Sequence, residues 1–237
     1  MKRFDAVLFD LDGTLIHSSP GIFEGLRYTA ARLGVSVEGQ DLTPYLGPPL
    51  RVIFERLLPD PAMAPHAVEI YREHYARVGS RMCRPYPFVP ELLAALRRQG
   101  VLLGVATCKL QPLAAEILGR QALAGQFACI GGTSPDGRIE SKAQVIRSVL
   151  AEPAFGRAAG AGRLLMVGDR KDDIEGARAC GLPSAGALYG YGGRAELKKA
   201  GADYLAQDGQ ELLELICPPK GQAAPSSPSL SPSSPSL

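Results

Sequence analysis

Several features that would mark a secreted, membrane-spanning or nucleic-acid-binding protein are missing from this sequence. The five cysteines are odd in number and form no C-x-x-C pair, so we expect reduced thiols in a cytoplasmic protein. No apolar run approaches the roughly 20 residues of a membrane-spanning helix, and acids interrupt the apolar part of the N-terminal "MKRFDAVLFDLDG", unlike a signal peptide. A net charge of +2 indicates neither a nucleic-acid polymer nor a membrane as partner.

What is present is the composition of an ordinary globular protein, with 46% hydrophobic and 21% charged residues. A chain of 237 residues can form one good core, or a core with a small additional domain. The segment at 218–237 differs from the rest, because it is a Ser/Pro repeat with almost no charge and no aromatic residue. Such a segment cannot bury enough apolar surface to offset its chain entropy, so we expect it to be disordered.

Short apolar runs alternate with helix-like segments along the chain. This alternation predicts an α/β fold in which helices cover both faces of a doubly wound parallel sheet. The runs that we expect to form strands are residues 5–9, 101–107, 127–132, 163–168 and 183–188.

The first two of these runs are separated by about 90 residues, far more than a single crossover helix needs. Apolar residues recur every three or four positions at 21–34 and 65–79, which indicates helices in this gap. The sequence therefore predicts a helical cap inserted after the first strand. The expected domains are a core of residues 1–16 and 87–217, a cap of residues 17–86 and the disordered tail of residues 218–237.

Acidic and polar residues stand where the expected strands end. Asp10 and Asp12 follow the first run, Thr107 closes the second, and Gly168 and Asp169 follow a later one. Because ligands of an open parallel sheet bind at the carboxyl ends of its strands, these residues are expected to meet at one site. Several carboxylates so close together either raise one another's pKa or require a cation, and hard oxygen ligands favour Mg²⁺.

Four ordered motifs resemble those of the haloacid dehalogenase-like (HAD) hydrolase superfamily: "FDLDGTL", the Thr of "VATCK", the Lys of "SKAQVI", and "VGDRKDDIEGARACG". The resemblance covers residues 1–217. Within the superfamily, "LGPPL" and "GALYGYGGRAELKKAGADY" resemble the phosphoglycolate phosphatase and bacterial 5′-nucleotidase-like branch. This resemblance implies a Rossmann-like sheet with a small helical cap, and an Mg²⁺-dependent phosphatase acting on a small phosphorylated metabolite.

The resemblance also implies roles for the acids. Asp10 would be the nucleophile that becomes an aspartyl-phosphate, and Asp12 would give a proton to the departing alcohol and later take one from water. On a fully extended strand their spacing would place both side chains on one face. The Thr14 hydroxyl and N–H would lie near the site. Mg²⁺ would be held by the Asp10 carboxylate, the Asp12 backbone carbonyl and Asp169.

Further residues would support this chemistry. Thr107 and Lys142 resemble the residues of the family that neutralise the phosphoryl oxygens. Gly168 and Asp173 are expected beside the metal ligands, and Asp173 either binds the metal or orients its water and Lys142. Lys109 follows Thr107 on an expected loop, where it either contacts the substrate or is a surface charge.

The remaining candidates lie in the expected cap or at its edge. Arg51 is either a solvated helix residue or a cap arginine that faces the phosphorylated substrate. His17 stands where many relatives carry an acid, so the resemblance assigns it no role. His66 and His74 have no acid or cysteine partner at ligand spacing and are expected to lie on the surface.

Other functions can be weighed on the same residues. A haloalkanoate dehalogenase would use Asp10 but would not need Asp12. A phosphonate-cleaving enzyme would need a lysine in the cap, and residues 18–86 contain none. A sugar-phosphate mutase remains an alternative, as does a phospho-accepting receiver, which is not an enzyme and needs neither cap nor second acid. Phosphoglycolate, nucleoside 5′-monophosphates and a broad set of phosphomonoesters all fit as substrates. The sequence does not indicate an oligomeric state.

Overall fold

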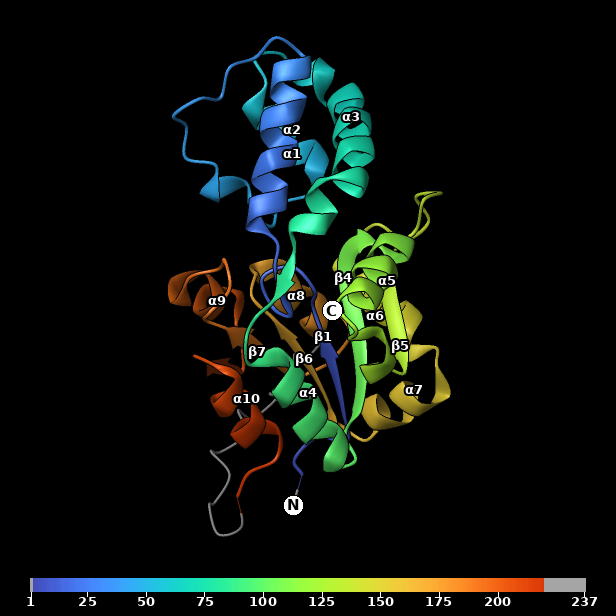
Figure 1. Ribbon diagram of the computed structural model, residues 1–237. Helices are drawn as coiled ribbons and strands as arrows, with labels where there is room; N and C mark the ends of the chain where they lie inside the picture. The colour runs from blue at the N-terminus through green and yellow to red at the C-terminus, as the bar shows by residue number, and fades with distance from the viewer. Residues whose placement is uncertain (1, 220–237) are drawn as a thin grey trace.

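The structure is a computed structural model that describes residues 2–219. Disorder is expected for residues 218–237. Residues 220–237 of this segment lie outside the described part of the chain. Among the described residues no helix combines the length and the apolar character needed to cross a membrane. Figure 1 shows a sheet flanked by helices and a separate helical group beyond one edge of it.

A six-stranded parallel sheet forms the centre of the molecule, in the order β5-β4-β1-β6-β7-β8, which confirms the predicted α/β fold. The strand β1 lies in the middle, between β4 and β6, so a residue that follows β1 lies at the centre of the carboxyl edge. The strands are β1 (Ala6–Phe9), β4 (Leu102–Leu110), β5 (Cys129–Thr133), β6 (Leu164–Gly168), β7 (Ser184–Ala187) and β8 (Tyr204–Ala206).

Helices cover both faces of this sheet because side chains along its strands alternate between two apolar clusters. Val7 and Phe9 of β1 belong to one cluster, and Ala6 and Leu8 to the other. The first cluster contains α4 (Val89–Arg98), α5 (Gln111–Arg120) and α10 (Gly209–Ile216). The second contains α6 (Lys142–Leu150), α7 (Pro153–Gly160) and α8 (Lys171–Arg178), while α9 (Arg194–Ala200) packs against α8.

The long segment between β1 and β4 forms a helical group of its own, which we call the cap. Two short antiparallel strands, β2 (Ile16–His17) and β3 (Arg84–Pro85), connect it to the sheet. Figure 1 shows the cap beyond the end of β1, over the carboxyl edge. Its helices are α1 (Ser19–Arg32), α2 (Leu50–Leu57) and α3 (Ala64–Arg77), with the short 3-10 turns η1 (Thr43–Tyr45), η2 (Pro61–Met63) and η3 (Gly79–Met82).

Some elements were not expected from the sequence. The strand β8 has only three residues, and the helix α2 has eight, so neither gives a long periodic pattern. The 3-10 turn η4 (Ala124–Gln126) is shorter than a helical period can reveal. Strand β4 continues to Leu110 after an irregularity in its pairing with β5, so Lys109 lies in a strand and not on the expected loop.

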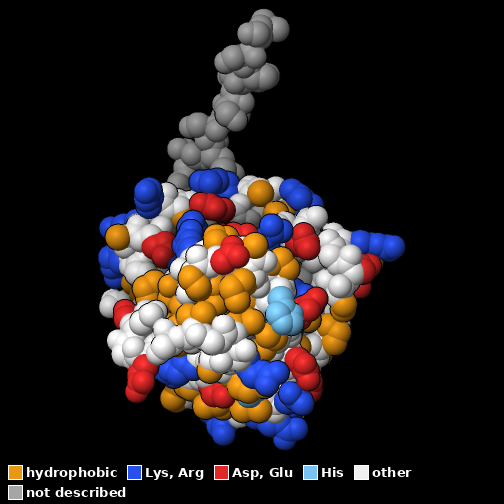
Figure 2. Space-filling view, turned by 90° about the horizontal axis from the view of Figure 1, so that it is seen from above, with side chains coloured by type: hydrophobic (Ala, Val, Ile, Leu, Met, Phe, Trp, Pro, Cys, Tyr) orange, Lys and Arg blue, Asp and Glu red, His pale blue; other side chains and the backbone are white. Residues whose placement is uncertain are grey.

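The surface of the cap carries both charge signs. Figure 2, which looks down on this end of the molecule, shows lysine, arginine and acidic side chains around a central area of hydrophobic ones. No patch of a single charge sign dominates this face, in keeping with the near-neutral net charge.

Candidate active site

Asp10 lies directly beyond the end of β1. Its backbone N–H donates to the Val167 carbonyl at 2.8 Å, which extends the pairing with β6 by one residue. Its side chain is buried, and Oδ1 accepts a 2.6 Å hydrogen bond from Lys142 Nζ. The carboxylate is therefore fixed at the centre of the carboxyl edge of the sheet, with a permanent cation beside it.

Lys142 reaches this position from the first turn of α6. A capping box that begins with Ser141 fixes the start of the helix. The buried ammonium contacts Asp10, donates to the Ala106 carbonyl at 2.8 Å and lies 2.7 Å from Asp173 Oδ1. Two of these contacts are hydrogen bonds and the third is an ion pair, so the position of the ammonium is strongly defined.

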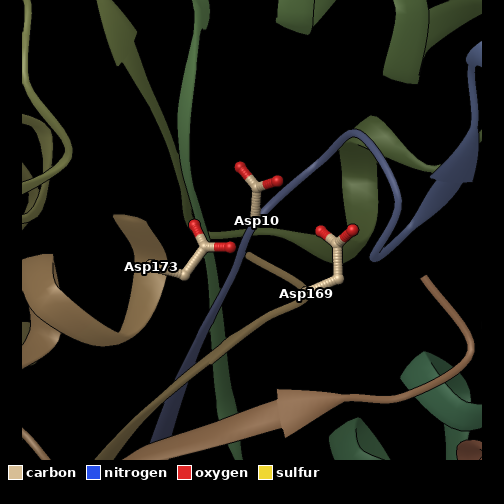
Figure 3. A group of neighbouring side chains, drawn as sticks. All are labelled: Asp10, Asp169 and Asp173. Atoms are coloured by element: carbon tan, nitrogen blue, oxygen red, sulfur yellow. The ribbon is translucent and has the colours of Figure 1, made fainter. Parts of the chain in front are cut away.

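Three buried carboxylates converge here, as Figure 3 shows: Asp10 after β1, Asp169 after β6 and Asp173 on the first turn of α8. One oxygen atom of each lies within 4.8 Å of the others. Asp169 is oriented by two donors, the Thr14 hydroxyl at 3.1 Å and the Tyr191 backbone N–H at 2.7 Å. The acids expected from the sequence at two separate strand ends therefore share one site.

Glycines allow the backbone to approach these acids closely. A Cβ on Gly168 would lie 2.2 Å from Cγ of Asp173, and one on Gly190 would lie 2.3 Å from Cβ of Asp169. A Cβ on Gly192 would meet the Asp169 carbonyl oxygen at 1.9 Å. The glycine-rich run after β7 thus closes over Asp169 in a space that no larger residue could share.

The electrostatics of the cluster favour an additional cation. Burial raises the pKa of Asp10 to about 6 although the charge of Lys142 opposes the shift. Burial and the neighbouring carboxylates raise the pKa of Asp169 well above its usual value. Burial alone would lower the pKa of Lys142, but the charges of Asp10 and Asp173 raise it above its ordinary range. Three carboxylates are thus accompanied by one ammonium group, and a further cation would stabilise their ionised forms.

A divalent metal ion fits this donor set. All the side-chain donors that converge are carboxylate oxygens, which hard cations such as Mg²⁺ prefer over nitrogen or sulfur. Asp10 and Asp169 were expected as ligands, and Asp173 was expected either on the metal or beside it. The grouping brings all three within reach of one ion. Asp173 is also engaged by Lys142 and by the Arg170 N–H, at 2.7 and 3.0 Å.

Asp12 faces a different cation. Its Oδ2 lies 2.9 Å from Lys109 Nζ, and its Oδ1 is buried without a hydrogen-bond partner among the described residues. The lysine side chain is 10% exposed, and it also donates to the Tyr75 hydroxyl at 3.1 Å. Burial would lower the pKa of Lys109, but the charge of Asp12 raises it above the usual value.

The geometric reason expected for the Asp10 and Asp12 spacing is wrong. Strand β1 ends at Phe9, and the chain turns after Asp10, with Asp12 in an isolated bridge to Ile16. Gly13 makes this turn with a φ of +81°, a value that residues with a side chain rarely adopt. The two acids therefore face their own lysines from a turn and not from one face of an extended strand.

Thr107 lies near the end of β4 and is buried. Its hydroxyl accepts a hydrogen bond from the Lys109 backbone N–H at 3.2 Å, within the stretch where the pairing with β5 is irregular. The neighbouring Ala106 carbonyl binds Lys142. The end of β4 thus contributes both to the Asp10 side and to the Asp12 side of the site.

Arg51 and His17 are not part of this cluster. The Arg51 side chain is 75% exposed, and its Nε pairs with Glu55 of the same helix at 2.8 Å. This is the solvated-helix alternative of the two considered for Arg51. His17 Nε2 lies 2.9 Å from the Ser19 hydroxyl at the start of α1, and its ring lies 6.3 Å from that of Tyr191.

The surface position expected for the other histidines holds for His66, but the expected lack of an acidic partner is wrong for both. His66 is 68% exposed, with Glu69 at 3.5 Å on the same helix. The expectation for His74 is wrong, because its ring is buried and stacks on Tyr28, and its Nε2 lies 2.6 Å from Glu24. Glu24 is 50 residues away in sequence, so the packing of α3 against α1 creates a pair that local spacing cannot reveal.

Sequence reasoning missed two tyrosines that connect the cap to the sheet. The Tyr191 hydroxyl accepts hydrogen bonds from the N–H groups of Ser18 and Ser19, at 2.7 and 2.9 Å, where α1 begins. Tyr75 of α3 contacts Lys109 at the end of β4. Only the glycines around Tyr191 gave a signal in sequence, since they indicate close packing. Tyr75 gave no signal, because aromatic residues are common on the buried face of a helix.

Comparisons with known proteins agree with this architecture. Over 191 residues the chain is 37% identical to the tyrosine-protein kinase PtkA of Mycobacterium tuberculosis, covering 78% of this chain but only 62% of that protein. It is 36% identical to the 5′-nucleotidase of Pseudomonas aeruginosa, covering 83% and 88% of the two chains. Identity to the phosphoglycolate phosphatase of Aquifex aeolicus is 35%, covering 78% and 85%.

The fold comparison extends over more of the chain. The crystal structure of a predicted phosphatase from Clostridium acetobutylicum superposes with a TM-score of 0.81 at 35% identity, covering 90% of this chain and 98% of that one. The profile of the haloacid dehalogenase-like hydrolases matches residues 7–187, from β1 through the acidic cluster to the end of β7. The chain therefore belongs to the haloacid dehalogenase-like hydrolase family.

Proposed function

We propose that this protein is an Mg²⁺-dependent phosphomonoester hydrolase that acts on a small phosphorylated metabolite through an aspartyl-phosphate on Asp10. One observation carries the proposal: a buried carboxylate at the centre of the sheet edge, fixed by Lys142 and grouped with Asp169 and Asp173. The relatives named 5′-nucleotidase and phosphoglycolate phosphatase support the same chemistry. We propose phosphoglycolate or a nucleoside 5′-monophosphate as the type of substrate.

The reaction proceeds in two displacements at phosphorus. An Asp10 oxygen forms a bond to phosphorus while the bond to the leaving oxygen breaks, and Asp12 gives that oxygen its proton. A water oxygen then forms a bond to phosphorus and releases Asp10, while Asp12 takes a proton from that water. The products are an alcohol and inorganic phosphate, and both aspartates return to their initial state.

The charges of the site suit this reaction. Lys142 and Thr107 hold the oxygens of the transferring group, whose negative charge would otherwise repel the attacking carboxylate. The Asp10 and Asp169 carboxylates and the Asp12 backbone carbonyl would hold Mg²⁺, which when bound would supply positive charge for the phosphoryl oxygens. The cap lies over the same edge, where we propose that residues 17–86 enclose the substrate and contact its leaving group.

A second candidate is transfer of the phosphoryl group to an acceptor other than water. The identity to a relative named tyrosine-protein kinase is as high as the identity to the phosphatases, so a tyrosine hydroxyl deserves a direct test. A sugar hydroxyl, as in a mutase, is the corresponding alternative. Either hydroxyl would replace water at the step in which the aspartyl-phosphate is resolved.

The experiment is a substrate screen of the full chain with Mg²⁺. Phosphate release is measured from phosphoglycolate, nucleoside 5′-monophosphates and other phosphomonoesters, and parallel reactions contain ATP with a tyrosine peptide. We expect phosphate release from at least one small ester and none from the Asp10→Asn variant. Phosphotyrosine in the peptide without release from any small ester would overturn the hydrolase proposal.

A further inference from the structure

The side chains beside Asp12 form a continuous chain of contacts from the turn after β1 to the cap. Lys109 Nζ lies 2.9 Å from Asp12 Oδ2 and 3.1 Å from the Tyr75 hydroxyl, to which it donates. The ammonium also lies 4.4 Å from the centre of the Tyr75 ring. The same hydroxyl contacts Cys83 Sγ at 3.4 Å. A single lysine of β4 therefore joins the acid to helix α3.

Lys109 and Tyr75 are largely shielded from water, whereas the Asp12 side chain is 23% exposed. The Lys109 side chain is 10% exposed, and Tyr75 is almost fully buried. A lysine has four rotatable bonds in its stem, so a free ammonium would sample many positions. The hydroxyl and ring face of Tyr75 hold this ammonium in one place, beside Asp12 Oδ2.

The two oxygens of Asp12 differ as a result. Oδ2 is occupied by Lys109, whereas Oδ1 is buried and has no hydrogen-bond partner within residues 2–219. A buried carboxylate oxygen without a partner is costly unless another group binds there during function. The water that resolves the aspartyl-phosphate is such a group, and it needs an oxygen held in a fixed direction.

We propose that Lys109 is a positioning residue for Asp12 and that Tyr75 holds it in place from the cap, so that Asp12 is aligned only while Tyr75 of α3 contacts Lys109 of β4. This inference rests on the proposed function. Hydrolysis of the aspartyl-phosphate is the step in which Asp12 acts as a carboxylate, the form that pairs with Lys109. That step therefore depends most on the contact chain.

A nitrophenyl ester separates this step from the first one. Nitrophenolate leaves without a proton, so phosphorylation of Asp10 needs little help from Asp12, while hydrolysis of the phosphoenzyme still needs it. Rapid mixing with Mg²⁺ and nitrophenyl phosphate gives the burst of nitrophenol and the later steady rate. The variants to compare are Lys109→Met, Lys109→Arg and Tyr75→Phe.

We expect Lys109→Met to keep a burst stoichiometric with enzyme and to lower the steady rate by about 10- to 100-fold, less than complete loss of a general base. Lys109→Arg should recover part of the rate because it keeps a cation. Tyr75→Phe keeps the ring and loses one hydrogen bond, so its steady rate should fall by about 2- to 10-fold. The matched control is Tyr71→Phe, since the Tyr71 ring stacks on the Tyr75 ring at 5.4 Å but its hydroxyl makes no hydrogen bond to Lys109 or Asp12.

Three results would overturn the inference and leave the proposed function in place. A raised KM with unchanged kcat in Lys109→Met would mean that Lys109 binds substrate. A burst amplitude that falls in proportion to the steady rate would mean that the contacts only keep the protein folded. Unchanged kinetics in Lys109→Met and Tyr75→Phe would also contradict it, while the hydrolase proposal would stand. A wild-type chain that releases no phosphate would overturn the proposed function and this inference together.

Discussion

Asp10 and Asp12 lie two residues apart, yet each pairs with its own lysine, which predicts that their losses are distinguishable. Asp10→Asn should abolish turnover, because an amide cannot replace the attacking carboxylate. Asp12→Asn should slow an alkyl phosphate by about 10²–10⁴-fold, because the leaving oxygen needs a proton. With nitrophenyl phosphate it should give one burst and then slow turnover, whereas Asp10→Asn should give none. A phosphoenzyme in Asp10→Asn would contradict this division of roles.

Gly168 allows a second test at the scale of single residues. A Cβ there would lie 2.2 Å from Cγ of Asp173, so Gly168→Ala must displace a side chain that contacts Lys142. We expect a loss of activity of at least about 10-fold, as for other misplaced catalytic groups. The matched control is Gly119→Ala, which meets no atom within 4 Å and should leave kcat unchanged. Equal activity of the two variants would show that the Asp173 position is not critical.

At the scale of elements, Tyr191 fixes the start of α1. Its hydroxyl accepts from the N–H groups of Ser18 and Ser19, both on buried residues. Tyr191→Phe leaves these donors without that partner, so we expect a loss of about 1–3 kcal/mol in the free energy of unfolding. The control is Tyr45→Phe, because Tyr45 is only partly buried. This change should alter stability by less than about 0.5 kcal/mol. Urea unfolding measures both, and equal losses would contradict the anchoring role.

Elements also show how far the sequence could predict this molecule. The strands flanking Asp10 and Asp169 could be predicted because buried parallel strands are continuous apolar runs that end at the site. Lys142 was accessible to prediction because its motif opens a helix. The contact of Lys109 with Tyr75 could not be predicted, because it joins two residues 34 positions apart, one in the cap and one in the sheet. The buried His74 with Glu24 was missed for the same reason, since helix packing creates it.

At the scale of the whole molecule, the buried acids should make stability depend on both pH and metal. Asp10 has a pKa of about 6 in the fold, raised by burial above the 3.8 of an ordinary aspartate. Between these values the folded state retains a proton that the unfolded state releases, so this group lowers stability as pH rises to about 6. Asp169, whose pKa is also raised, acts in the same direction. Ionisation of Asp10 should thus remove part of the stability of the metal-free protein between pH 4 and about 6, and ionisation of Asp169 should add to this loss.

Mg²⁺ should reverse this loss, because it binds the ionised carboxylates and competes with protons. At roughly 100 times its Kd we expect Mg²⁺ to raise the melting temperature by about 5–10 °C at pH 8, where these acids are charged. At pH 5, where protons occupy part of the cluster, the same concentration should raise it by much less. Calorimetry with chelator or with Mg²⁺ at each pH measures the difference in melting temperature. The Asp169→Asn variant removes one charge from the cluster and should reduce the Mg²⁺ effect at pH 8. An equal Mg²⁺ effect at both pH values would show that the ion binds away from the buried acids.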